Sequence, residues 1–111
     1  MYTYYTKNLF FKLAYCFSLN SVPASVYSFM AVTQPGVFSG YDESFSENPF
    51  ERSLMLAMSF GGDTDTIMSM TGAIAGAYYG ESAIPEYMKH ICEGICDARR
   101  QADQLHKIMT Q

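Results

Sequence analysis

Residues 61–66 read GGDTDT, and a run of small and apolar residues, IMSMTGAIAGAYYG, follows at 67–80. The glycine pair ends any helix before it, and Asp63 or Thr64 can cap the helix that begins after it. The apolar run then continues as a helix. The sequence therefore predicts two helices, over 49–60 and 63–79, that meet at a sharp corner.

The acids at this corner allow two interpretations. Asp63 and Asp65 lie two residues apart with hydroxyls interleaved, which places several hard oxygen atoms at one helix start and suits Mg²⁺. A bound cation would oppose the helix dipole, so the two negative charges would have to overcome that effect. Alternatively, the acids only cap the first turn, where acidic residues are favoured anyway. On spacing alone, the capping interpretation is the commoner one.

Upstream, we expect a helix that begins at Ser21, with Pro23 in its first turn. Its apolar residues recur at helical spacing and form one stripe, made of Val22, Val26, Phe29 and Met30. The breaker pair at 35–36 ends this helix. The polar residues 36–47 then form a surface loop.

Two other helix starts contain proline. The sequence NPFE at 48–51 places Asn at the N-cap, Pro at the first helical position and Glu at the third, as in a capping box. Residues 85–86 open another helix, which Gly94 and Asp97 can interrupt, and residues 98–109 form an amphipathic helix. No stretch alternates like a strand, so the predicted class is all-α.

Gly72, Gly76 and Gly80 recur at every fourth residue after the corner, with alanines between them. Glycine costs about 1 kcal/mol against alanine in a helix interior, so close approach of a neighbouring backbone is the expected compensation. We therefore predict a central, buried helix that holds the corner rigidly. Its acidic start and short length do not fit a membrane span.

The composition fits a single globular domain of 111 residues, since 49% of them are hydrophobic. The net charge of −4 and the lack of a basic stripe argue against nucleic acid as a direct partner. Residues 1–19 are apolar and aromatic, but Lys12 interrupts them and arginine is absent. This pattern fits neither a signal peptide, nor a membrane span, nor a mitochondrial presequence. We expect a cover on the core or a segment foreign to the domain.

Cysteine and histidine suggest no separate chemistry. Cys16, Cys92 and Cys96 form no regular disulfide framework, which favours a reducing compartment. Cys92 and Cys96 share a helix face, but zinc would need two further ligands that the sequence does not place. His106 has no catalytic partner nearby in the sequence, and we assign it no catalytic role.

The residues around the corner resemble a known family. Residues 50–80, FERSLMLAMSFGGDTDTIMSMTGAIAGAYYG, are similar to the C-terminal part of the ADP-ribosylglycohydrolases. The likeness is closest to the ADP-ribosyl-serine hydrolase branch, which also acts on poly(ADP-ribose) and O-acetyl-ADP-ribose. It extends over residues 18–111, whereas 1–17 lie outside it. The family fold is an all-helical orthogonal array, in agreement with the pattern.

The resemblance implies a metal-dependent hydrolase. Family members use two Mg²⁺ ions to bind the distal ribose of ADP-ribose and cleave its C1″ bond. Asp63, Asp65 and Thr66 match the family's C-terminal metal ligands, while Thr64 is not expected to be a ligand. The implied partners are ADP-ribosylated proteins or small molecules containing ADP-ribose, with no direct nucleic acid and no membrane. The complete enzyme is expected to be a monomer in the cytoplasm, nucleus or mitochondrial matrix, with a role in the DNA damage response.

The other half of the family site has no counterpart in this sequence. The family completes it with a Thr-Asp-Asp cluster and a catalytic Glu far upstream, whereas the chain contains no Asp-Asp pair. Glu43, Glu47 and Glu51 do not lie in the catalytic context, and no residue is assigned to catalysis or substrate binding. We expect a hydrolase fragment that is inactive alone. The alternatives are a short binding protein without activity and a fragment of an ADP-ribosyl-arginine hydrolase. Upstream coding sequence for a Thr-Asp-Asp segment would favour a fragment, and a native mass near 12.5 kDa would favour the short protein.

Overall fold

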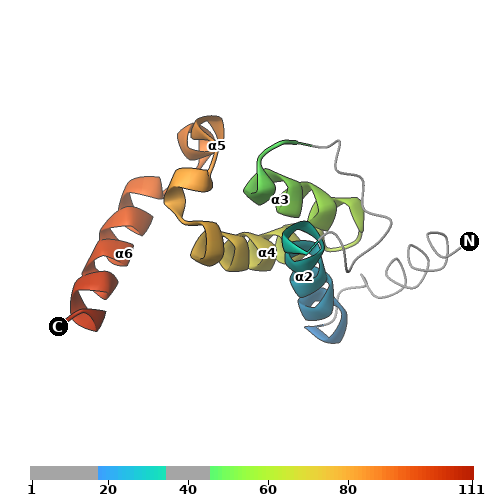
Figure 1. Cartoon of the computed structure of the whole chain (residues 1–111), viewed down its shortest axis with the longest axis horizontal. Coiled ribbons are helices and arrows are strands. Elements are labelled where there is room, and N and C mark those ends of the chain that lie inside the picture. Colours follow the sequence, from blue (N-terminus) through green and yellow to red (C-terminus); the bar gives the residue numbers. More distant parts are fainter. Residues whose placement is uncertain (1–17, 35–45) are drawn as a thin grey trace, which may run out of the picture.

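The computed structural model describes residues 18–34 and 46–111, and over these ranges its regular structure is entirely helical (Figure 1). The predicted all-α class is confirmed. The elements are α2 (Ser18–Thr33), α3 (Pro49–Ser59), α4 (Thr64–Tyr79), the short 3₁₀ helix η2 (Glu81–Ala83), α5 (Glu86–Ile91) and α6 (Ile95–Met109). The expectations for residues 1–17 and for most of the 36–47 loop lie outside the described residues. No helix within the described ranges is long and apolar enough to cross a membrane.

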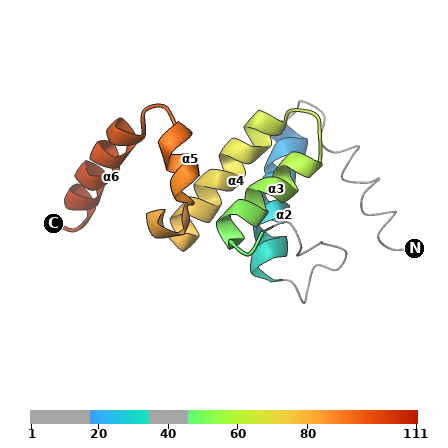
Figure 2. The same ribbon diagram turned by 90° about the horizontal axis from the view of Figure 1, so that it is seen from above.

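Three helices, α2, α3 and α4, pack against one another and form the body of the structure (Figures 1 and 2). Their core contains Ala24, Ala57 and Ile67, which are completely buried, with Phe60 and Met68 packed at its edge. Small side chains dominate this core, which allows the helix axes to lie close together. The body is therefore held by the contacts of a few well-buried residues.

Helix α2 begins earlier than the sequence predicted. It starts at Ser18 rather than Ser21, which places Pro23 inside the helix and not in its first turn. Proline has no N–H, so the helix loses one backbone hydrogen bond at this position. Pro23 is exposed, and its ring therefore meets solvent instead of a neighbouring helix.

The buried face of α2 is also different from the predicted one. Val22 and Val26 are 47% and 39% exposed, whereas Ser25 and Ser28 are almost completely buried. The serine hydroxyls donate to carbonyl groups of their own helix, at 2.8 Å for Ser28 Oγ to the oxygen of Ala24, so they are buried with a partner. Close helix packing favoured the small residues, and the predicted apolar stripe was wrong for the two valines.

The corner between α3 and α4 is formed as predicted. Helix α3 ends at Ser59, and Gly61 and Gly62 follow with φ angles of 71° and 69°. Residues with a side chain rarely adopt this left-handed conformation, so two consecutive glycines allow the chain to reverse over a very short distance. Helix α4 then begins at Thr64.

Helix α4 buries one face only, which corrects the prediction of a central helix enclosed by its neighbours. Ile67, Thr71 and Ala75 are buried, whereas Ala73, Ala77 and Tyr78 are exposed. The glycines meet no neighbouring backbone: a Cβ at Gly72 would lie 3.5 Å from Leu54 Cδ2, and one at Gly76 would lie 3.9 Å from Phe50 Cε2. Gly80 lies beyond the helix end, with φ of 82°.

Replacing Gly76 with alanine should therefore stabilise the chain. The new methyl group would make an ordinary contact with Phe50, and the helix would gain about 1 kcal/mol of intrinsic propensity. For a domain of this size the melting temperature should rise by roughly 4–8 °C. The control is Gly80→Ala, which forces a side chain into a left-handed conformation and should lower the melting temperature. If the melting temperature fell equally in both variants, a methyl group at Gly76 would have to clash with its neighbours, and the prediction would be wrong.

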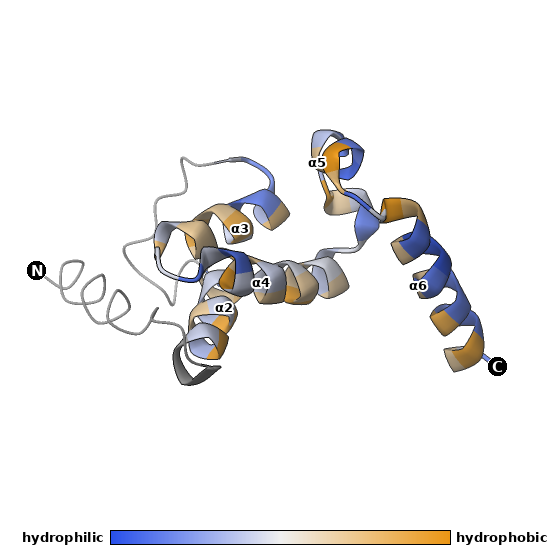
Figure 3. Cartoon of the chain, turned by 180° about the vertical axis from the view of Figure 1, so that it is seen from behind, coloured by the Kyte–Doolittle hydropathy of each residue, from blue (hydrophilic) through white to orange (hydrophobic). Residues whose placement is uncertain are grey.

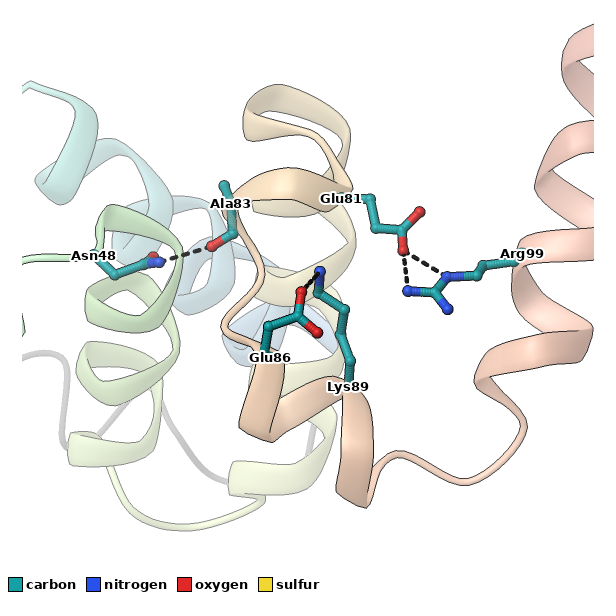
Figure 4. Close-up of polar contacts among 6 residues, drawn as sticks. All are labelled: Asn48, Glu81, Ala83, Glu86, Lys89 and Arg99. Atoms are coloured by element: carbon teal, nitrogen blue, oxygen red, sulfur yellow. Dashed lines mark hydrogen bonds and ion pairs between the residues drawn. The ribbon is translucent and has the colours of Figure 1, made fainter.

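The start of α3 is tied to the segment after α4. Asn48 accepts a hydrogen bond from the Glu51 N–H at 3.1 Å, and its Nδ2 donates to the carbonyl of Ala83 at 2.8 Å (Figure 4). The predicted capping box is only half formed, because the Glu51 carboxylate accepts from Ser46 Oγ at 2.7 Å instead of the Asn48 N–H. Tyr87 of α5 also donates to Glu51. One asparagine thus caps α3 and fixes it to η2.

Asn48→Ala should cost more than an ordinary helix cap. It removes the cap and the bond to Ala83 together, and we expect a loss of about 2 kcal/mol. Asn48→Asp keeps an acceptor for the Glu51 N–H but loses the donor, so it should lose roughly half as much. Chemical denaturation of the three proteins measures both values. If Asn48→Asp matched the wild type, the bond to Ala83 would contribute nothing to stability.

The C-terminal helix α6 projects away from the three-helix body (Figures 1 and 2). Gly94, with φ of 75°, separates α6 from α5 and confirms the predicted interruption. Asp97 interrupts no helix, because it lies in the first turn of α6. An ion pair between Arg99 and Glu81 of η2 connects it to the rest (Figure 4). Every residue from 96 to 111 is exposed, so the apolar side of this predicted amphipathic helix has no cover within the described residues.

Candidate metal half-site

The first turn of α4 presents the acid pair. Asp63 is the N-cap residue, with φ of −80° and ψ of 66°, but its side chain makes no capping hydrogen bond. The Thr64 N–H bonds to the carbonyl of Gly62 at 2.9 Å, and the carbonyl of Asp63 accepts from the N–H of Ile67 at 3.2 Å. The backbone therefore forms the corner without the Asp63 carboxyl, which leaves that group available for other interactions.

Asp65 lies two residues further along the chain, and its Oδ1 accepts from the Thr66 N–H at 2.9 Å. Interaction with the Asp63 side chain, and to a smaller extent the bond from Thr66, lowers the pKa of Asp65. Asp65 and Thr66 are exposed and Asp63 is half-buried, so the pair is open to solvent.

This donor set fits a hard divalent cation. Two adjacent carboxylates repel each other unless a proton or a cation lies between them, and carboxylate oxygen is the ligand that Mg²⁺ prefers. Capping does not account for the position of Asp63, because its side chain caps nothing. Binding of metal by Asp63, Asp65 and Thr66 stays a prediction.

The pair does not form a complete site with other residues of the described part. Within residues 18–34 and 46–111, no group of three or more His, Cys, Asp or Glu side chains could hold a metal ion. A small cation with an octahedral shell needs further ligands from water, substrate or protein. The described part of the structure thus contains a pair of acids and not a complete set of metal ligands.

The other titratable residues lie elsewhere. Cys92 and Cys96 are free and exposed, and His106 is exposed on α6. Hydrogen bonds from Tyr87 and then Ser46 lower the pKa of Glu51, and the same contact with Glu51 raises the pKa of Tyr87. Glu51 therefore has a structural role at the start of α3. The sequence pattern did not reveal its contact with Tyr87, because the two residues lie on different helices.

Comparison with known proteins identifies the family of the chain. The sequence profile of the ADP-ribosylglycohydrolases matches residues 6–111, and the chain belongs to this family. The matched region begins before Ser18, whereas the resemblance seen in the sequence begins at Ser18. No solved structure matches the chain.

The relatives found belong to the predicted branch. The chain is similar to the ADP-ribosylhydrolase ARH3 of Gallus gallus, with 38% identity over 96 residues, which covers 85% of this chain and 24% of that protein. The proteins of the same name from Mus musculus and Homo sapiens are 38% identical over 94 and 91 residues, covering 85% and 82% of this chain and 24% of each relative. The chain spans about a quarter of the length of these relatives.

Proposed function

We propose that this chain is part of a magnesium-dependent ADP-ribosyl hydrolase and supplies one half of its metal site. The observation that supports this most directly is the pair of acids at the start of α4, where the Asp63 side chain makes no capping hydrogen bond and both residues are accessible to solvent. Membership of the ADP-ribosylglycohydrolase family adds the reaction class. The relatives are named ADP-ribosylhydrolases, which favours ADP-ribosylated substrates.

The corner residues would act by positioning. Asp63 and Asp65, with the hydroxyl of Thr66, would hold Mg²⁺ at the start of α4, and the glycine corner would keep them in place. Bound magnesium orients ribose hydroxyls and water and stabilises negative charge. Cleavage of the ribose C1″ bond passes through an oxocarbenium-like state, which nearby carboxylates favour. The general acid or base would come from the remainder of the domain, since the family's upstream catalytic Glu has no counterpart in this sequence.

The preferred substrates in this proposal carry ADP-ribose on serine, in poly(ADP-ribose) or in O-acetyl-ADP-ribose. ADP-ribosyl-arginine is the alternative linkage, because the same metal corner serves both branches of the family. A binding protein without activity is the second candidate. It is favoured by the lack of a third metal-ligating group near Asp63 and Asp65 in the described part.

The test compares ADP-ribose release from four substrates, with peptides modified on serine and on arginine as the decisive pair. The purified chain should release no ADP-ribose, with or without Mg²⁺, while isothermal titration should show weak Mg²⁺ binding. Activity should appear when the remainder of the domain is supplied, and EDTA should abolish it. Magnesium-dependent release by the chain alone, lost in Asp65→Ala, would overturn the view that half of the site is missing.

A further inference from the structure

The chain turns between α5 and α6, and a cysteine lies on each side of this turn. Cys92 is the C-cap residue of α5, with extended φ and ψ angles of −80° and 113°, and Cys96 lies in the first turn of α6. The spacing predicted that both cysteines share one helix face, and this prediction was wrong, because α5 ends at Ile91 and α6 begins only at Ile95. Both thiols are free and exposed. The pair therefore spans the joint between two helices.

The backbone of this joint brings the two cysteines towards each other. Glu93 and Gly94 form the turn, and the φ and ψ angles of Gly94, 75° and 11°, are those of the third residue in a type II turn. Such a turn places the Cα atoms of its first and fourth residues, here Cys92 and Ile95, within about 7 Å of each other. Cys96 is the next residue. A disulfide requires Cα atoms about 4.4–6.8 Å apart, so a bond between the cysteines calls for a further rotation at the joint.

The surroundings of the joint leave room for that rotation. A Cβ placed on Gly94 would meet no heavy atom within 4 Å. Helix α6 leads away from α2, α3 and α4 (Figures 1 and 3), and every residue from 96 to 111 is exposed. Arg99, which forms the ion pair with Glu81, lies three residues after Cys96 and hence on the same side of α6. A movement of Cys96 would therefore change the direction of α6 and the position of its ion pair together.

We propose that Cys92 and Cys96 form a reversible disulfide that fixes the direction of α6 relative to α5. Glutathione disulfide is the oxidant. The thiolate of one cysteine attacks a sulfur of glutathione disulfide, which forms a mixed disulfide and releases one glutathione thiolate. The thiolate of the other cysteine then attacks the protein sulfur of the mixed disulfide and releases the second glutathione thiolate. Two electrons pass from the protein to glutathione, and the two released thiolates take up the two thiol protons.

Other roles fit these thiols less well. A structural zinc ion needs four ligands, and no group of three or more His, Cys, Asp or Glu side chains in residues 18–34 and 46–111 could hold a metal ion. A permanent structural bridge would be buried and formed without any movement of the backbone. A disulfide that is exposed and closes only after a rotation is readily reduced, which suits a switch.

The experiment incubates the full 111-residue chain with excess glutathione disulfide and follows its intact mass. The mass should fall by about 2 Da, because one disulfide replaces two thiols, and dithiothreitol should restore it. A protease that cleaves after glutamate cuts between the cysteines at Glu93, and without reductant the two fragments should stay joined. Cys92→Ser and Cys96→Ser should each stop at the mixed disulfide with glutathione. Cys16→Ser is the matched control and should form the bridge like the parent chain.

Amide hydrogen exchange tests the effect on α6. Exchange at residues 93–98 should slow at least about tenfold after oxidation, because the bridge restricts the opening of the joint. Circular dichroism of the serine variants checks that their helices are intact. The proposal is overturned if the parent chain forms dimers between molecules or keeps bound glutathione in place of the internal bridge. It is also overturned if Cys16→Ser prevents the bridge, or if oxidation leaves the exchange at residues 93–98 unchanged.

Discussion

The Asp65→Asn variant should bind Mg²⁺ at least about tenfold more weakly than the parent chain, and the enzyme assembled from it should release ADP-ribose at least about 100-fold more slowly. The amide keeps the size of the side chain and one oxygen, but it removes the negative charge that a hard cation requires. It also changes the interaction with Asp63 that lowers the pKa of Asp65. Isothermal titration and a peptide de-modification assay measure the two effects.

Asp97→Asn is the matched control for this variant. Asp97 is also an acid in the first turn of a helix, but it pairs with Arg100 at 2.8 Å on the exposed surface of α6. Its loss should change neither magnesium affinity nor activity. If both variants lost magnesium affinity equally, general electrostatic attraction would explain the binding, and a specific site at the corner would be refuted.

Ile67→Ala should produce the largest change in stability. Ile67 is fully buried between α2, α3 and α4, and it is the largest side chain in the central cluster with Ala24 and Ala57. Removing a buried aliphatic group of this size costs about 2–5 kcal/mol, because the surrounding helices close the cavity only partly. Against a total stability of roughly 5–15 kcal/mol for a native domain, this loss should lower the melting temperature by at least about 10 °C.

Ile108→Ala makes the same chemical change on a surface. Ile108 is 69% exposed on α6, which makes little contact with the three-helix body. Its replacement should leave the melting temperature of the isolated chain within experimental error. Thermal denaturation followed by circular dichroism compares the two variants. A comparable loss in both would mean that α6 packs more closely than the described structure indicates.

The sequence predicted the helix boundaries well where a local motif sets them. The NPFE motif at 48–51, the glycine pair at 61–62 and Gly94 each end or begin a helix through backbone geometry that neighbouring residues determine. The location of the acid pair follows from the same local rule. The lack of a capping hydrogen bond from the Asp63 side chain does not, because the same sequence is compatible with a capping aspartate.

The sequence was less informative where contacts between helices decide the outcome. The predicted stripe of Val22 and Val26 was expected to face the core, but the serine and alanine side of α2 packs there because it permits closer approach. The contacts of Asn48 with Ala83 and of Tyr87 with Glu51 join residues far apart in the chain. Hydrophobic periodicity identifies a helix face, and it does not distinguish between two faces that can both be buried.

The short corner at Gly61 and Gly62 also affects how the protein reaches its folded state. Asp63 and Asp65 belong to one helical turn, so their arrangement requires closure of only a very short loop and little conformational entropy. Helical turns form within about a microsecond, which is faster than the packing of distant helices. The acid pair should therefore be assembled before the distant helices meet, and magnesium would bind a preformed turn. Magnesium binding would then depend on the local opening of this corner and not on global unfolding. Amide hydrogen exchange at Thr64 to Ile67 measures that local opening.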